Sequence, residues 1–332
     1  MAETVVYAIL LPFAVSASIA YSAGRLPLPS SLKQTVLPLA IASAITASWA
    51  MLPHHPPWIP KHHWHWIPAI AWLMTALSPL TSLGAGSRSI RRHADATSTV
   101  AARSDIDRRP VTLEPSPAAN AASCRTTTDA VTIHRMATLA VVLLAASVTA
   151  WLLVPQWKSL SPPRALWLPF LASYLALLGI VASRPLRDSM TIPFAWANMT
   201  IAAVIAIVLI AMFVSVTYAS FASATGSAMA GCWLVLWRRP ELRASALGLA
   251  LSYATLIGGW AFIGCVEPRS PAWSFLAIPW SGVSAAAWTL ERYRHGSARL
   301  RSVWWHAAIA FMLQFIIMGI VIFRIFCTPS PR

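Results

Sequence analysis

The sequence predicts an all-α membrane protein: a polytopic transmembrane helix bundle of about ten spanning helices with one long disordered inner loop. Two observations carry this prediction. Of the 332 residues, 57% are hydrophobic and only 11% are charged, whereas soluble domains contain roughly a quarter charged residues. Apolar runs close to twenty residues long, the length that crosses a bilayer as a helix, recur along the chain.

The apolar runs divide the chain into three parts. Residues 1–83 contain three predicted helices, residues 84–135 form a polar loop, and residues 136–327 contain seven more helices. The predicted helices are Val5–Ala23, Thr35–Leu52, Trp66–Leu83, Met136–Val154, Ala165–Ala182, Phe194–Thr217, Ala219–Trp237, Leu247–Val266, Ala272–Leu290 and Val303–Phe326. The seventh is the weakest prediction, because it is rich in Ser, Ala and Gly and follows the sixth almost without a break.

The loop from residue 84 to residue 135 consists mainly of Ala, Ser, Thr and Arg and has no helical or strand periodicity. Such a segment cannot bury enough apolar surface to offset the entropy lost on ordering. We therefore expect it to be disordered.

The distribution of basic residues predicts which side of the membrane each loop occupies. If residues 84–135 lie inside, 19 of the 25 Lys and Arg residues fall in inner loops and six in outer segments. This asymmetry follows the positive-inside rule. It predicts a bacterial inner-membrane protein with residues 84–135 in the cytoplasm and both termini outside.

Most of the 17 tryptophans lie near the predicted helix ends. Trp49, Trp64, Trp151, Trp167 and Trp273 fall near outer ends, for example. Because indole is amphipathic, tryptophan collects at the head-group level of a bilayer. We therefore expect these side chains to form interfacial belts.

The outer loop between the second and third helices is rich in histidine. It contains His54, His55, His62, His63 and His65 within twelve residues. Imidazole is a common ligand of zinc and copper, so a Zn or Cu site is one interpretation. The other is an interfacial loop among lipid head groups, since the loop has no Cys, Asp or Glu.

Polar residues inside the predicted spans are few. Asn198, His306 and Gln314 are the candidates for a substrate path, because polar side chains at membrane depth often mark one. Interhelical hydrogen bonding is the simpler interpretation. No Asp or Glu lies deep in a predicted helix; Glu267 and Glu291 lie at helix ends.

Small residues recur every fourth position in two predicted helices. Ser220, Ala224, Ala228 and Cys232 form one such row, accompanied by Gly231, and Ala40, Ala44 and Ser48 form another. Small faces let two backbones approach closely, so we expect tight helix packing there.

The net charge of +15 does not indicate nucleic-acid binding, because the cations lie in short loops between apolar helices. The inner loop after the ninth helix carries Arg292, Arg294, Arg299 and Arg301. We expect these arginines to contact anionic lipid head groups on the inner face. The four cysteines form no CxxC pair, so neither a disulfide framework nor a cysteine metal site is indicated.

Three functions remain open from the sequence, in this order of preference. The first is a permease for a neutral or lipophilic small molecule, since proline-broken helices are frequent in transporters. The second is a membrane scaffold or assembly partner that transports nothing. The third is a membrane enzyme or metal-binding protein that uses the His54–His65 loop at the outer face. In that case, only Glu267 or Cys265 could approach the histidines from the outer side. The sequence indicates no oligomeric state.

Overall fold

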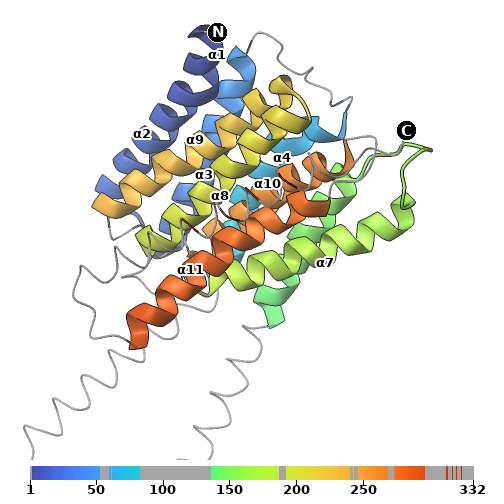
Figure 1. Cartoon of the computed structure of the whole chain (residues 1–332). Coiled ribbons are helices and arrows are strands. Elements are labelled where there is room, and N and C mark those ends of the chain that lie inside the picture. Colours follow the sequence, from blue (N-terminus) through green and yellow to red (C-terminus); the bar gives the residue numbers. More distant parts are fainter. Residues whose placement is uncertain are drawn as a thin grey trace, which may run out of the picture.

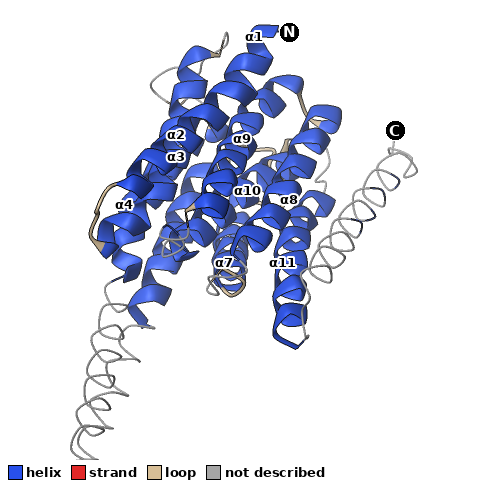
Figure 2. Cartoon of the chain, turned by 90° about the vertical axis from the view of Figure 1, so that its left-hand side faces the viewer, coloured by secondary structure: helices blue, strands red, loops and turns tan. Residues whose placement is uncertain are grey.

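The computed structural model describes residues 2–52, 60, 62–82, 136–186, 192–239, 242, 246–267 and 273–295, and four single positions from 312 to 323. Every regular element in these residues is a helix (Figures 1 and 2). Seven helices among the described residues are long and apolar enough to cross a membrane. They fit a multi-pass membrane protein, as the sequence predicted.

The N-terminal elements are α1 (Ala2–Val5), η1 (Val6–Leu10), α2 (Leu11–Arg25), α3 (Ser30–Met51), η2 (His63–Trp66), α4 (Ile67–Leu77) and η3 (Ser78–Ser82). An unlabelled helix covers Met136–Leu153. The later elements are α7 (Arg164–Ser183), α8 (Ile192–Phe213), α9 (Val216–Arg238), α10 (Ala246–Val266), η5 (Trp273–Leu276) and α11 (Ala277–His295). The seventh predicted helix, the weakest from sequence, is the continuous and membrane-length α9.

The predicted count of ten spanning helices is not confirmed. The predicted helix Trp66–Leu83 is divided into α4 and two short 3₁₀ turns; Pro79, which has no N–H to continue the helix, lies in the second turn. The predicted helix Ala272–Leu290 corresponds to η5 and α11, which is not among the seven candidate spans. The predicted helix Val303–Phe326 and the loop 84–135 lie outside the described residues, apart from four helical positions of the former.

Helix α10 lies at the centre of the bundle (Figure 1), and residues 248–266 of it are all buried. Its apolar residues run around the whole circumference, as is typical of a fully buried helix. Two of its polar side-chain atoms find partners on neighbouring helices. The Tyr253 hydroxyl donates to the Pro279 carbonyl at 2.8 Å, and Trp260 Nε1 donates to Thr225 Oγ1 at 3.1 Å.

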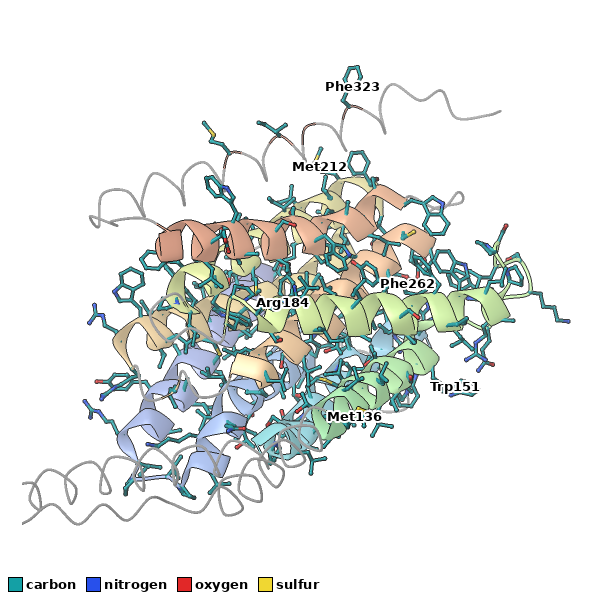
Figure 3. All side chains as sticks on the ribbon, turned by 90° about the horizontal axis from the view of Figure 1, so that it is seen from below. Met136, Trp151, Arg184, Met212, Phe262 and Phe323 are labelled. Atoms are coloured by element: carbon teal, nitrogen blue, oxygen red, sulfur yellow. The ribbon has the colours of Figure 1, made fainter. Side chains whose placement is uncertain are left out.

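The periphery of the bundle carries large apolar side chains. Trp151 and Met212 are 60% and 54% exposed, whereas Phe262 on α10 is fully buried. Figure 3 shows the first two at the edge of the bundle and Phe262 within it. An apolar outer surface around a packed interior is what lipid contact requires.

The small-residue rows on α9 and α3 pack as predicted. Ala40, Ala44 and Ser48 are fully buried on α3. A Cβ atom added at Gly231 of α9 would overlap Ser16 Oγ and would lie 2.6 Å from the Phe13 carbonyl oxygen, both on the neighbouring α2 segment. The absence of a side chain at Gly231 therefore sets how closely α2 and α9 approach.

A further contact between helices compensates for a local change in backbone hydrogen bonding. At the end of the π-helical turn η1, the Leu11 N–H bonds to the Val6 carbonyl instead of that of Tyr7. The next residue, Pro12, has no N–H to offer. The hydroxyl of Ser48 on α3 donates to the Tyr7 carbonyl, which explains why a polar residue is buried in the α3 small-residue row.

We predict that Gly231→Ala destabilises the protein by about 1–3 kcal/mol, because the Phe13 carbonyl is backbone and cannot move aside. Thermal unfolding in detergent measures the effect. The matched control is Gly179→Ala on α7, whose added Cβ would meet Ala254 and Leu251 at an ordinary 3.5 Å. Equal melting temperatures for the two variants would contradict the close packing of α2 and α9.

Aromatic side chains make contacts between segments at both ends of the bundle. At one end, the Trp64 ring lies 5.9 Å from Trp49 and 5.0 Å from Tyr218, measured between ring centroids. At the other end, Arg239, which follows α9, lies over the ring of Tyr21 on α2. The first group belongs to segments that the sequence places on the outer side of the membrane, and the second to segments that it places on the inner side. Which end faces the cytoplasm remains a prediction.

Candidate functional site

The histidine loop enters the fold through a short 3₁₀ turn. His62 is extended, and His63–Trp66 forms η2, which continues directly into α4. The backbone N–H of His65 donates to the His62 carbonyl at 3.1 Å, and the His62 N–H lies 3.4 Å from His65 Nδ1. These bonds turn His63, Trp64 and His65 inward, where all three are buried.

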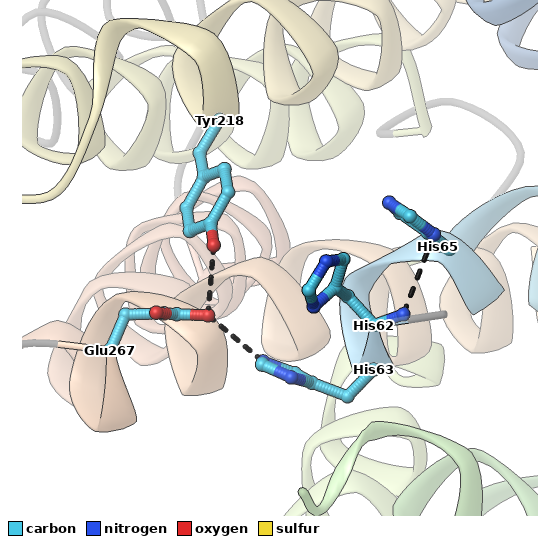
Figure 4. A network of polar contacts seen from close by, with 5 residues as sticks. All are labelled: His62, His63, His65, Tyr218 and Glu267. Carbon is cyan, nitrogen blue, oxygen red and sulfur yellow. Dashed lines mark hydrogen bonds and ion pairs between the residues drawn. The ribbon is translucent and has the colours of Figure 1, made fainter. Parts of the chain in front are cut away.

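The buried His63 meets an acidic residue from a distant part of the chain. Its Nε2 atom lies 3.3 Å from Oε1 of Glu267, the residue that follows α10. The hydroxyl of Tyr218, in the first turn of α9, donates to the same oxygen at 3.1 Å. Figure 4 shows the three side chains converging from η2, α9 and the end of α10. We call this group the His63–Glu267–Tyr218 site.

Aromatic packing fixes the positions of these groups. The His63 ring meets Trp157 edge-on, with centroids 5.3 Å apart. Trp64 packs against both Tyr218 and Phe221, at centroid distances of 5.0 and 5.1 Å. The side chains of the site are therefore packed against a cluster of aromatic rings.

Burial favours the neutral forms of both titratable groups. Desolvation lowers the pKa of His63 to about 4, and the neighbouring His62 and His65 act in the same direction. Desolvation also raises the pKa of Glu267, although the Tyr218 hydrogen bond and His62 oppose the rise. His63 Nε2 is not aligned for a hydrogen bond. We interpret the 3.3 Å contact as a neutral imidazole beside a carboxyl group, because removing two full charges from water would cost more.

A cavity of about 370 Å³ opens beside Glu267. Its walls come from the turn between α8 and α9, the first turn of α9 and Glu267, through Phe213, Val214, Ser215, Thr217, Tyr218 and Glu267. The turn forms because Ser215 is extended and its hydroxyl accepts the Thr217 N–H at 3.2 Å, which caps α9. The volume lies within the range of small-molecule sites, roughly 300–1,000 Å³.

The cavity wall combines hydrogen-bonding groups with apolar surface. It contains one carboxyl group, three hydroxyl groups, and the side chains of Phe213 and Val214. Such a lining can orient a small ligand through a few polar contacts while burying its apolar part. The Glu267 carboxyl group beside His63 could also exchange a proton with a ligand.

The described histidines do not assemble a metal centre. Within the described residues, no group of three or more His, Cys, Asp or Glu side chains is placed to hold a metal ion. His65 Nδ1 faces the His62 N–H and His63 Nε2 faces Glu267, so these atoms do not converge on a common point. His54 and His55 lie outside the described residues. The Zn or Cu site remains a prediction, which zinc calorimetry with His62, His63 and His65 replaced by Ala would test.

The predicted substrate path is only partly described. Asn198 is buried in α8 and donates from Nδ2 to the Phe194 carbonyl of the same helix at 3.0 Å. Residues 306 and 314 lie outside the described residues. Asn198 does not line the cavity beside Glu267.

Among the residues predicted to contact lipid, Arg292 and Arg294 lie in the last turns of α11, and Arg299 and Arg301 lie outside the described residues. Cys265, the alternative partner for the histidines, is fully buried in α10 and does not line the cavity.

The prediction of interfacial tryptophan belts is wrong for several of the rings. Trp49, Trp64 and Trp167 are 3%, 8% and 1% exposed, whereas Trp151 and Trp273 are 60% and 49% exposed. The first three pack against aromatic residues of neighbouring helices instead of lipid. Position near a helix end does not reveal whether a ring faces lipid or another helix.

No family model, no curated protein and no solved structure matches the chain.

Tyr218 is the member of the site that the sequence did not single out. It lies in the apolar first turn of α9, where a tyrosine at a helix end is expected at the head-group level. Its only sequence signal is its predicted location at the same end of the bundle as Glu267.

Proposed function

We propose that this chain is a permease-like multi-pass membrane protein that takes a neutral small molecule at the cavity beside Glu267. One observation carries the proposal: the carboxyl group of Glu267 lines the cavity, accepts a hydrogen bond from the hydroxyl of Tyr218 in the same wall, and contacts the buried His63. A partly buried carboxyl group beside a cavity is a functional-site signal in membrane proteins.

The chemistry of the site favours a neutral ligand over an ion. Burial lowers the pKa of His63 and raises the pKa of Glu267, so both are biased toward their uncharged forms. The remaining polar groups of the wall are hydroxyls. A ligand that offers hydrogen-bond donors and acceptors, such as a polyol or an amide, matches this lining.

A second candidate is a membrane scaffold that transports nothing. The burial of residues 248–266 of α10 favours it, because a closed interior leaves less room for a path. The cavity beside Glu267 favours the permease over the scaffold, since a scaffold has no need of a carboxyl-lined cavity at the end of the bundle.

Osmotic swelling of proteoliposomes distinguishes the two functions. Vesicles containing the purified chain are mixed with iso-osmotic glycerol, erythritol or urea, and swelling is followed by light scattering. A permease should accelerate swelling over protein-free vesicles for at least one solute. Ser215→Trp, which fills the cavity, should return the rate to that of protein-free vesicles, whereas Arg164→Gln, away from the cavity wall, should not. Equal rates with and without protein for all three solutes would favour the scaffold.

A further inference from the structure

The end of the bundle opposite the His63–Glu267–Tyr218 site holds two arginines on one aromatic ring. Arg25, the last residue of α2, places its guanidinium carbon 4.7 Å from the centroid of the Tyr21 ring. Arg239, which follows α9, places its own 4.7 Å from the same centroid. The two guanidinium carbons are therefore at most twice 4.7 Å apart.

Both side chains are held in place by neighbours. The Arg25 guanidinium donates to the Tyr21 hydroxyl at 2.8 Å. The stem of Arg239 packs over Gly24, where an added Cβ would lie 3.5 Å from Arg239 Cγ. The Arg239 backbone N–H donates to the Val235 carbonyl at 2.8 Å. This geometry brings residues from α2 and α9 to one place, which charge repulsion alone would oppose.

No acidic group in the described part of the chain neutralises the pair. Among the described residues, the structure pairs a basic with an acidic side chain at His63 and Glu267, which lie at the other end of the bundle. The partial negative charge at the ends of α2 and α9 attracts one arginine each. This attraction to the helix ends does not explain why both guanidinium groups contact the same ring, that of Tyr21.

We propose that Arg25, Tyr21 and Arg239 form a binding site for a phosphate group, as carried by an anionic phospholipid or by free phosphate. Arginine presents a planar fork of N–H donors that matches phosphate oxygens. Tyr21 is partly exposed, and Leu26 and Trp237 expose apolar surface at the same end of the bundle, at 55% and 42%. Apolar surface around paired arginines suits a head group whose acyl chains lie against the protein.

Native mass spectrometry of the detergent-purified full-length chain tests the site. The protein is incubated with equimolar phosphatidylglycerol and phosphatidylcholine that carry the same acyl chains. We expect the wild type to retain phosphatidylglycerol preferentially. Arg25→Gln and Arg239→Gln should each weaken that retention roughly fivefold. The matched control is Arg164→Gln, because Arg164 also lies 4.7 Å from an aromatic ring, that of Trp151, but alone and at the other end; it should change nothing.

A second arm separates the two sources of phosphate. Inorganic phosphate is added at millimolar concentration while melting temperature and lipid retention are followed. Displacement of phosphatidylglycerol together with a rise in melting temperature would show that free phosphate occupies the site. Retention of the lipid would assign the site to a phospholipid. Equal retention of both lipids by the wild type, with no effect of phosphate, would overturn the proposal without need of any variant. If the glutamine variants fail to fold, Arg25→Lys with Arg239→Lys keeps the charge and should still lose part of the selectivity.

Discussion

At a pH below the pKa of Glu267, replacing Glu267 by alanine is expected to slow solute uptake about tenfold, whereas replacing it by glutamine should leave uptake nearly unchanged. Alanine removes the carboxyl group that faces the cavity and leaves the Tyr218 hydroxyl without its acceptor. A hydrogen bond lost between the carboxyl group and the solute costs about 1–1.5 kcal/mol, or roughly tenfold. Glutamine keeps the shape and the acceptor oxygen without the charge. Swelling rates of proteoliposomes carrying each variant measure the difference.

Solute uptake should also depend on pH, and the same variants test this dependence. Because burial raises the pKa of Glu267, its carboxyl group stays protonated to a higher pH than an exposed one. Uptake should then fall as pH rises through this raised pKa, since the carboxylate disfavours a neutral ligand. Below the pKa of His63, about 4, the imidazolium should reduce uptake in turn. In Glu267→Gln the loss at high pH should disappear. Uptake that rises with pH in the wild type, or a glutamine variant as inactive as the alanine variant, would show that the ionised carboxylate is the working form.

Trp260→Ala should destabilise the protein by about 3–5 kcal/mol, the largest effect that we expect from one substitution. Trp260 is 1% exposed at the centre of the bundle, and its Nε1 donates to the buried Thr225 hydroxyl. Removal of the ring leaves both a cavity and an unpaired hydroxyl. Thermal and denaturant unfolding in detergent measure the change.

Trp72 provides the matched control for Trp260. Its Nε1 also donates to a threonine hydroxyl, that of Thr46, at 3.0 Å, but its side chain is 43% exposed. Trp72→Ala should therefore cost clearly less than Trp260→Ala, because much of the Trp72 ring is already exposed and its removal leaves no enclosed cavity. Similar losses for the two variants would contradict the position of α10 as the core of the bundle.

The sequence predicted most of the helices because hydropathy is a local property. The predicted helix Leu247–Val266 differs from α10 (Ala246–Val266) by one residue, and Ala165–Ala182 differs from α7 (Arg164–Ser183) by one at each end. The boundary between α8 and α9 was placed too late, after Thr217. The extended, capping Ser215 ends α8 earlier, and a lone serine in an apolar run gives little sign of this role.

The site could be predicted only in part, because its contacts join distant segments. The His loop and Glu267 were assigned to the same side of the membrane from the charge of the loops, and the structure brings His63 and Glu267 together. Hydropathy gave no indication that the loop folds inward or that Glu267 becomes partly buried beneath it. Tyr218 was not predicted, because its role depends on the first turn of α9 packing beside Glu267. Such choices are made by packing and not by local composition.

Cysteine labelling tests the central claim, that a solvent-accessible cavity lies beside Glu267 at one end of the bundle. Ser215→Cys in the cavity wall and Asn198→Cys in α8 are introduced after Cys124 and Cys327 are replaced by serine, while the fully buried Cys232 and Cys265 are kept. A membrane-impermeant thiol reagent should modify the cysteine at 215, more slowly when the best solute from the swelling assay is present. The cysteine at 198, where the native side chain is 3% exposed, should stay unmodified. Protection at both positions, or labelling at 215 that the solute does not slow, would contradict the account.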